Sequence, residues 1–275
     1  MRDRKPFFYF ALAAVAIAIF VLAGCKEDAT TTPPGATVTP ITDDLFPLTV
    51  GHKFYYTGFA TAPRPVTGGG GDTLPDPGNV YRTIWTVGPP VTTPLGGAGV
   101  ALFDTTTLYA NPPGFPVTFG RTLIIRKDSA SGDFFFMQTI GPFKRAFGIT
   151  IGSQPEDTLV FLAIARASQG VGGTGAQWTA YDSTFSGTGG VSVRLQIFGR
   201  IETQETITDS SATPTQHSVY RSRTWRRITV GGTIVQDDAT TSILWLKKDF
   251  GPVQVRIVED TENIGHWRFL TSANF

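Results

Sequence analysis

One glycine-rich segment has the spacing of a known cofactor-binding turn. Gly170-Val-Gly-Gly-Thr-Gly175 matches the glycine pattern that binds the pyrophosphate of a dinucleotide. That turn works only where a strand precedes it and a helix begins directly after it, so that backbone amides face the phosphates. The residues that follow, Ala176 to Thr184, form a poor helix sequence. We therefore interpret the match as chance in a glycine-rich chain and expect no cofactor.

The titratable residues form no catalytic or metal-binding pattern. The histidines, which are far apart in the sequence, are His52, His217 and His266. Carboxylates gather at Asp43-Asp44, Asp237-Asp238 and Glu259-Asp260-Thr-Glu262, where oxygen ligands could collect calcium; solvated charge clusters are our interpretation. There is no Gly-x-Ser-x-Gly elbow, Ser-x-x-Lys pair or phosphate-binding loop. We expect no metal site, no catalytic residues and no enzyme activity.

The one thiol is the residue with the clearest chemistry. Cys25 is the only cysteine, and Leu22, Ala23 and Gly24 precede it directly. An apolar run from Pro6 to Gly24 follows a basic start. A basic start, an apolar middle and small residues at the end are typical of a secretory signal.

The ending Leu22-Ala23-Gly24-Cys25 resembles the lipobox of bacterial lipoproteins. The resemblance implies that residues 1–24 are a signal peptide, that a signal peptidase recognises Leu22, Ala23 and Gly24, and that Cys25 carries the membrane anchor. Lys26 follows the cysteine where an aspartate would favour the inner membrane, so the outer membrane is expected. The alternative is an uncleaved transmembrane anchor. The apolar run from Pro6 to Gly24 is almost as long as the roughly 20 residues that a bilayer core needs.

Composition limits the partners and the source of stability. Charged residues make up 16% of the chain and the formal net charge is +1, so no nucleic-acid partner is expected, since such proteins carry a basic face or stripe. With a single cysteine there is no disulfide framework, and stability must come from an apolar core. Residues 25–44 are polar and rich in Thr and Pro, which predicts a disordered tether before a domain spanning residues 45–275.

Alternating apolar and polar residues predict a β domain. Val191, Val193, Leu195, Ile197 and Ile201 fall on one face of a strand, which is typical of a half-buried antiparallel sheet. Further strands are predicted at Val253–Ile257, Tyr81–Val87, Leu123–Arg126, Ser218–Trp225 and Ile243–Leu246. The apolar run Leu159–Ala167 is expected to be a strand, with a short helix as the alternative. We predict a mostly β fold: a single antiparallel sheet, open and curved or half-barrel, with few short helices.

Two segments resemble a loose, largely uncharacterised group of cell-envelope lipoproteins. Leu45-Phe-Pro-Leu-Thr-Val-Gly-His-Lys-Phe-Tyr-Tyr56 resembles the group's entry motif, Phe-Pro-Leu-x-x-Gly-x-x-(Trp/Phe)-x-Tyr, with Phe54 where tryptophan is usual. Trp245-Leu-Lys-Lys-Asp-Phe-Gly-Pro-Val253 resembles the closing motif. The resemblance implies a curved antiparallel sheet, similar to folds that carry lipoproteins or hold periplasmic substrates. It implies no active site.

Two sets of side chains are candidates for binding. Phe134, Phe135 and Phe136 would line an acyl-chain pocket if they faced the concave side of a sheet; core packing is the alternative. Arg221 and Arg223 share a predicted strand face with Trp225. They could contact lipid phosphates or a protein partner, or they could be a solvated face on which arginine stems cover aromatic rings.

The expected function is therefore binding. We predict a non-enzymatic, membrane-anchored envelope lipoprotein that holds an apolar ligand or a protein partner on its sheet. One alternative is a hydrolase or carbohydrate-active enzyme, which needs two facing carboxylates about 5–10 Å apart. Another is a structural subunit of a surface assembly, which would show an unpaired edge strand or an exposed apolar patch.

Overall fold

The computed structural model describes residues 41, 44–62, 74–110, 116–128, 130–139, 159–171, 176–257 and 265–275. All of them belong to one compact unit, Thr37–Phe275. The predicted signal peptide, Cys25, most of the tether, Asp43 and the cluster at residues 259–262 lie outside the described residues. None of the helices in the described ranges has the length and hydropathy needed to cross a membrane.

The described chain forms one antiparallel sheet of 12 strands. They are β1 (Lys53–Ala62), β2 (Leu74–Thr92), β3 (Ala98–Ala110), β4 (Val117–Lys127), β5 (Phe134–Thr139), β6 (Leu159–Ala165), β7 (Trp178–Ser186), β8 (Ser192–Thr208), β9 (Gln216–Val230), β10 (Thr233–Lys247), β11 (Gly251–Ile257) and β12 (Gly265–Asn274). Two 3-10 turns accompany them, η1 (Ala167–Gln169) and η3 (Thr188–Gly190). The predicted fold class is confirmed, and Leu159–Ala165 is a strand, as expected.

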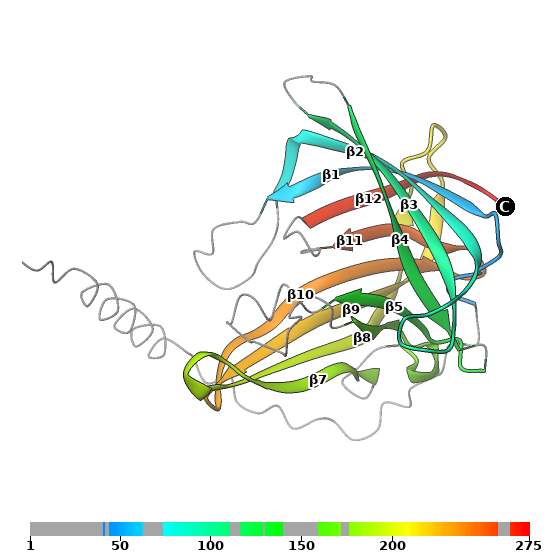
Figure 1. Ribbon diagram of the computed structural model, residues 1–275. Coiled ribbons are helices and arrows are strands. Elements are labelled where there is room, and N and C mark those ends of the chain that lie inside the picture. The colour runs from blue at the N-terminus through cyan, green and yellow to red at the C-terminus, as the bar shows by residue number, and fades with distance from the viewer. Residues whose placement is uncertain are drawn as a thin grey trace, which may run out of the picture. The chain divides into compact units, whose positions relative to one another are not determined.

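The strand order is β6-β5-β4-β3-β2-β1-β12-β11-β10-β9-β8-β7. Neighbours in sequence are therefore neighbours in the sheet, except that the first and last strands pair at its centre and the two edges are the consecutive strands β6 and β7. Figure 1 shows β3 and β4 running steeply across β12, β11 and β10, so the sheet is strongly curved. Its concave side holds the core.

The two edges approach each other without forming a ladder. Trp178 on β7 donates from Nε1 to the carbonyl oxygen of Ala163 on β6 (3.1 Å). Ser222 on β9 donates from Oγ to the carbonyl oxygen of Ile164 (2.6 Å). In the described ranges the one backbone bridge near these edges is parallel and joins Val171 to Ile201. The sheet is thus nearly closed, like a barrel with a seam joined mainly by side chains.

The segments that resemble the entry and closing motifs pack against each other in the core. Phe46 and Phe54 meet edge to face, with centroids 5.7 Å apart, and Tyr56 donates from its hydroxyl to the carbonyl oxygen of Pro252 (2.8 Å). Gly251 has a φ of +116°, and a Cβ there would lie 3.1 Å from the Phe46 ring. A glycine in the left-handed region without a side chain therefore lets both aromatic rings fit.

Candidate functional site

A polar cluster lies on the inner face of the sheet, where β2, β3, β4 and β12 face the core. Asp104 on β3 accepts hydrogen bonds from Arg268 Nη1 (3.1 Å) and from Arg121 Nε (3.1 Å) at the same oxygen, Oδ2. Its other oxygen, Oδ1, accepts from Thr106 Oγ1 (2.7 Å). Thr83 Oγ1 lies 3.0 Å from Thr106 Oγ1. The cluster therefore joins β3, β4 and β12 at one carboxylate, and β2 through Thr106.

Strand register explains how distant residues reach one carboxylate. Asp104 lies opposite Trp85 on β2 and opposite Arg121 on β4, so these three side chains share the inner face. Arg268 on β12 lies opposite Gly58 on β1. A Cβ at Gly58 would meet the backbone of β12 at the Trp267 carbonyl and the Cα of Arg268, so glycine lets the β12 backbone lie this close to β1.

The charges of this cluster are buried and fixed. Asp104 is 1% exposed and Arg268 is 3% exposed. Burial alone would raise the pKa of Asp104, but the charges of Arg268 and Arg121 outweigh it and leave that pKa below its usual range. Burial lowers the pKa of Arg268, an effect that Asp104 opposes. An ionised carboxylate between two guanidinium groups is suited to recognition, and its protonation does not change near neutral pH.

Two buried donors beside this carboxylate have no hydrogen-bond partner. They are Nε of Arg268 and Nε1 of Trp85. The two side chains are in contact, since the Arg268 guanidinium carbon lies 5.7 Å from the centroid of the Trp85 ring. Buried donors are nearly always satisfied by protein or by an ordered molecule. These two donors therefore have no acceptor among the protein atoms, and an ordered water or a bound group would supply one.

The inner face opens to solvent at β4. By register, Val117 and Phe119 share the inner face with Arg121, yet they are 59% and 45% exposed. β5 pairs with β4 only from Ile125 to Lys127. Among the described strands, none pairs with β4 from Val117 to Ile124 on that side. The concave surface is thus reachable past two apolar side chains that lead to Arg121.

The three phenylalanines of the predicted ligand face do not share one face. Phe134 and Phe136 are buried in the core, where Phe134 meets Phe46 and Phe136 meets Trp85. Phe135 points to the other side of β5, and the Arg126 guanidinium carbon lies 4.7 Å from its ring centroid. Their role in ligand binding stays a prediction.

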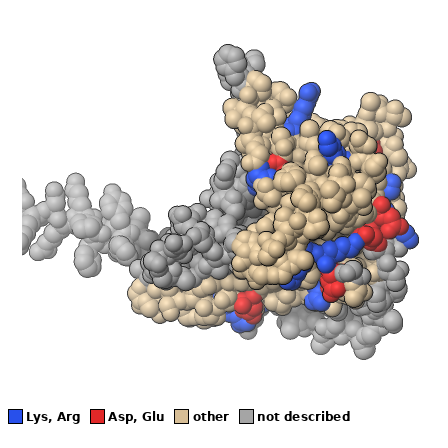
Figure 2. Space-filling view, turned by 45° about the vertical axis from the view of Figure 1, so that its right-hand side comes forward, with Lys and Arg blue, Asp and Glu red and all other residues tan. Residues whose placement is uncertain are grey.

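Arg221, Arg223 and Trp225 lie on one face of β9, the outer face of the sheet. The Arg223 guanidinium carbon lies 5.3 Å from the centroid of the Trp225 ring, and Arg221 forms an ion pair with Glu202 (2.8 Å). Trp225 is buried beneath these arginines. Contact with a membrane or partner stays a prediction. In the face seen in Figure 2, basic and acidic side chains lie beside each other between wide uncharged areas.

The remaining sequence candidates lie apart from one another. His217 Nε2 is 2.7 Å from Asp209 Oδ2, and Lys247 Nζ is 3.2 Å from His217 Nδ1. Asp237 pairs with Arg227 through two bonds of 2.9 Å. Gly170 follows η1, and residues 172–175 lie outside the described ranges. No group of three or more His, Cys, Asp or Glu that could hold a metal ion occurs in the part of the chain that the structure describes.

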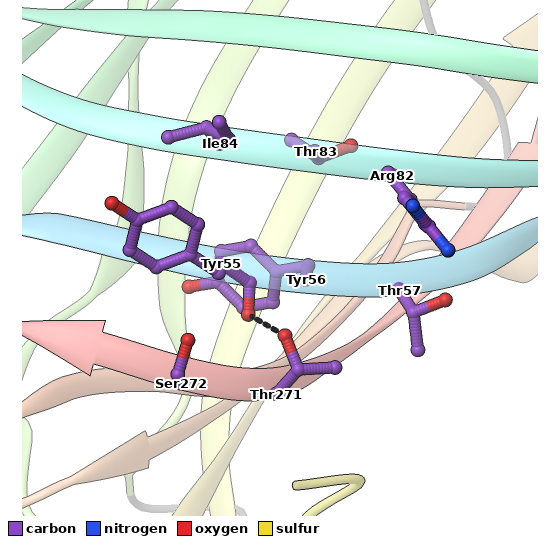
Figure 3. A pocket seen from close by; sticks show the side chains of 8 residues that line it. All are labelled: Tyr55, Tyr56, Thr57, Arg82, Thr83, Ile84, Thr271 and Ser272. Atoms are coloured by element: carbon purple, nitrogen blue, oxygen red, sulfur yellow. Dashed lines mark hydrogen bonds between the residues drawn. The ribbon is translucent and has the colours of Figure 1, made fainter. Parts of the chain in front are cut away.

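A shallow depression of about 460 Å³ lies over β1, beside the irregularity at Tyr55 and Tyr56 in its pairing with β12. Its lining residues are Tyr55, Tyr56, Thr57, Arg82, Thr83, Ile84, Thr271 and Ser272. Figure 3 shows the Thr271 side chain turned to the backbone of Tyr55, to whose carbonyl oxygen it donates (2.9 Å). The depression is open and contains no buried, unpartnered group, so the inner polar cluster is the better candidate site.

No protein-family model matches the chain, and no curated protein matches it. A predicted lipoprotein from Parabacteroides distasonis is similar in structure, with 11% identity, a TM-score of 0.40, and coverage of 84% of this chain and 99% of that chain. A predicted exported protein with a YmcC-like fold from Bacteroides fragilis has 12% identity, a TM-score of 0.40, and coverage of 85% and 100%. Likenesses at this level carry no inference about function.

Proposed function

We propose that this chain is a lipid-anchored protein of the cell envelope that binds a ligand on the concave face of its sheet without chemically changing it. The observation that carries the binding proposal is the exposure of Val117 and Phe119 on an inner face. Their inner-face neighbours Thr106 and Asp104 are buried. Apolar side chains that lead from solvent into a concave surface with few polar groups are typical of ligand sites.

Fixed protonation favours binding over catalysis. General acid–base catalysis needs a group whose pKa lies near the working pH. The pKa of Asp104 is lowered by its arginine partners, although burial opposes them, and burial raises the pKa of Tyr56 well above its ordinary value. Both groups therefore keep one protonation state around neutral pH, which supports recognition and not proton transfer.

The anchor proposal rests on the sequence Leu22-Ala23-Gly24-Cys25. Intact-mass spectrometry of the protein purified from membranes tests it. The expected mass is that of a chain beginning at Cys25 plus a diacylglycerol. The Cys25→Ser variant is expected to lose the lipid and remain uncleaved. A wild-type mass that includes residues 1–24 would contradict the anchor proposal.

Bound ligand can be sought in the same preparation. We expect organic extraction of the natively purified protein, followed by mass spectrometry, to release a small molecule at about one per chain. Extraction of the Phe119→Asp variant is the control, because a charge on the exposed apolar lip should deplete that molecule without disturbing the buried core. A wild-type protein that releases nothing beyond its covalent lipid would contradict binding of a small ligand.

A second candidate, a subunit of a surface assembly, is favoured by the edge of β4. Residues Val117 to Ile124 have no strand neighbour on one side among the described strands, and such edges can pair with another chain. If this candidate is right, sedimentation of the purified protein should show oligomers that Phe119→Lys, a charged change on that edge, converts to monomers. A wild-type monomer at all concentrations would exclude it.

A further inference from the structure

We propose that the ligand of the concave face is an amphiphile whose anionic head group, a carboxylate or phosphate, binds at Arg121 while its apolar part lies on Phe119 and Val117. This inference rests on the proposed function and adds the chemical class of the ligand. It is carried by the arrangement of charge, apolar surface and unpartnered donors along β4 and its neighbours.

The charge of the cluster is incomplete. Two guanidinium groups, Arg121 and Arg268, face one carboxylate, Asp104. No other acidic side chain pairs with either arginine among the described residues. The cluster therefore carries one net positive charge, which a single anionic group would neutralise. Guanidinium groups bind carboxylates and phosphates through paired N–H donors.

The excess positive charge lies on Arg121, the arginine of the cluster that solvent can reach. Arg268 is buried, but the side chain of Arg121 is 35% exposed. Arg121 uses Nε for Asp104, so its terminal amino groups are left for an anion arriving from solvent. Binding there leaves the bond between Asp104 and Arg268 intact.

The apolar surface is in line with this cation. Inner-face residues of a strand recur every second position, and on β4 they read Val117, Phe119 and then Arg121. Two exposed apolar side chains thus precede an exposed cation over roughly 13 Å of strand, at about 3.3 Å per residue. A short acyl chain with an anionic end could therefore lie along β4, with its apolar part on Val117 and Phe119 and its charge at Arg121.

Two buried donors without a partner lie deeper in the sheet and could also bind the head group. Arg268 Nε and Trp85 Nε1 are buried without a partner, and Trp85 lies opposite Asp104 in the β2–β3 ladder. Oxygen atoms of a head group, or a water molecule that it holds, would supply the acceptors these donors lack.

Calorimetric titration of the lipid-anchored protein, residues 25–275, in phosphatidylcholine nanodiscs, with empty nanodiscs subtracted, tests the inference. The probes are octanoate, octyl phosphate, octanol and inorganic phosphate. We expect octanoate and octyl phosphate to bind at least tenfold more tightly than octanol, which lacks the charged acceptor, since hydrogen bonds to charged groups contribute about 1.5–3 kcal/mol. They should also bind at least tenfold more tightly than inorganic phosphate, which lacks the apolar part. Arg121→Gln should remove that advantage. Arg126→Gln, on the outer face of the same strand, should not.

The possible outcomes separate the two proposals. Equal binding of octanoate and octanol would overturn the anionic head group and leave ligand binding standing. Inorganic phosphate binding as tightly as octyl phosphate would overturn the apolar part. If no probe binds, the inference of an anionic amphiphile is wrong, and the proposed ligand binding is then decided by the extraction experiment alone. An equal loss in Arg121→Gln and Arg126→Gln would remove Arg121 from the site.

Discussion

Arg268→Met is expected to lower the free energy of unfolding by about 3–5 kcal/mol, the usual cost of removing one partner of a buried ion pair. Asp104 would remain in a fully buried position with Arg121 as its single charged partner. Methionine is chosen because it fills a similar volume against Trp85 without a charge. Urea denaturation followed by tryptophan fluorescence measures the change.

The double variant Arg268→Met/Asp104→Leu is the matched control for this prediction. With both charges removed, no uncompensated carboxylate remains, so most of the lost stability should return. Arg126→Met, which replaces an exposed arginine on β4, should change stability by less than about 0.5 kcal/mol. A single Arg268→Met variant as stable as the parent would show that the pair is not what fixes Asp104 in the fold.

Gly58→Ala is the second substitution for which a large loss of stability is expected. A Cβ at Gly58 would collide with the carbonyl oxygen of Trp267 and lie 2.9 Å from the Cα of Arg268. Both are backbone atoms of the paired strand β12, so no side-chain rotation relieves the contact. Overpacking of this kind costs about 1–3 kcal/mol or more, and we expect the upper end, measured as a lowered midpoint of thermal unfolding.

Gly120→Ala provides the comparison. Gly120 is also within a strand, but the nearest heavy atom to a Cβ there is the carbonyl oxygen of Asp104, 4.0 Å away. With space available, alanine should leave stability unchanged or raise it by about 0.4–1 kcal/mol, because it restricts the unfolded chain. Similar losses in the two variants would mean that strand geometry, and not the contact with β12, limits both sites.

The fold was predictable because a strand that is buried on one face alternates apolar and polar residues along the sequence. Val193, Leu195, Ile197 and Ile201 are all buried, as the sequence of β8 indicated. The same rule, applied consistently, separates Phe135 from Phe134 and Phe136, since consecutive strand residues point to opposite faces. Three adjacent aromatic residues therefore could not line one surface.

The polar cluster was not predicted, because its members are joined only by the pairing of distant strands. Asp104 and Arg268 are separated by 164 positions in the sequence. A local signal did exist: alternation places Arg268 on the same face as the buried Leu270, and Asp104 on the same face as the buried Leu102. A charge at an inward position predicts a partner, but strand order and register decide which one.

The seam between β6 and β7 gives the sheet a preferred place to part. Among the described residues, separating these edges breaks the bonds from Trp178 to Ala163 and from Ser222 to Ile164, together with the Val171–Ile201 bridge. Every ladder between neighbouring strands would stay whole. Local opening is cheapest where few backbone hydrogen bonds are lost. The seam is thus joined by fewer backbone hydrogen bonds than any strand ladder of the described sheet, and the buried side chains of Leu162, Ile164 and Trp178 at its two edges belong to the same core cluster.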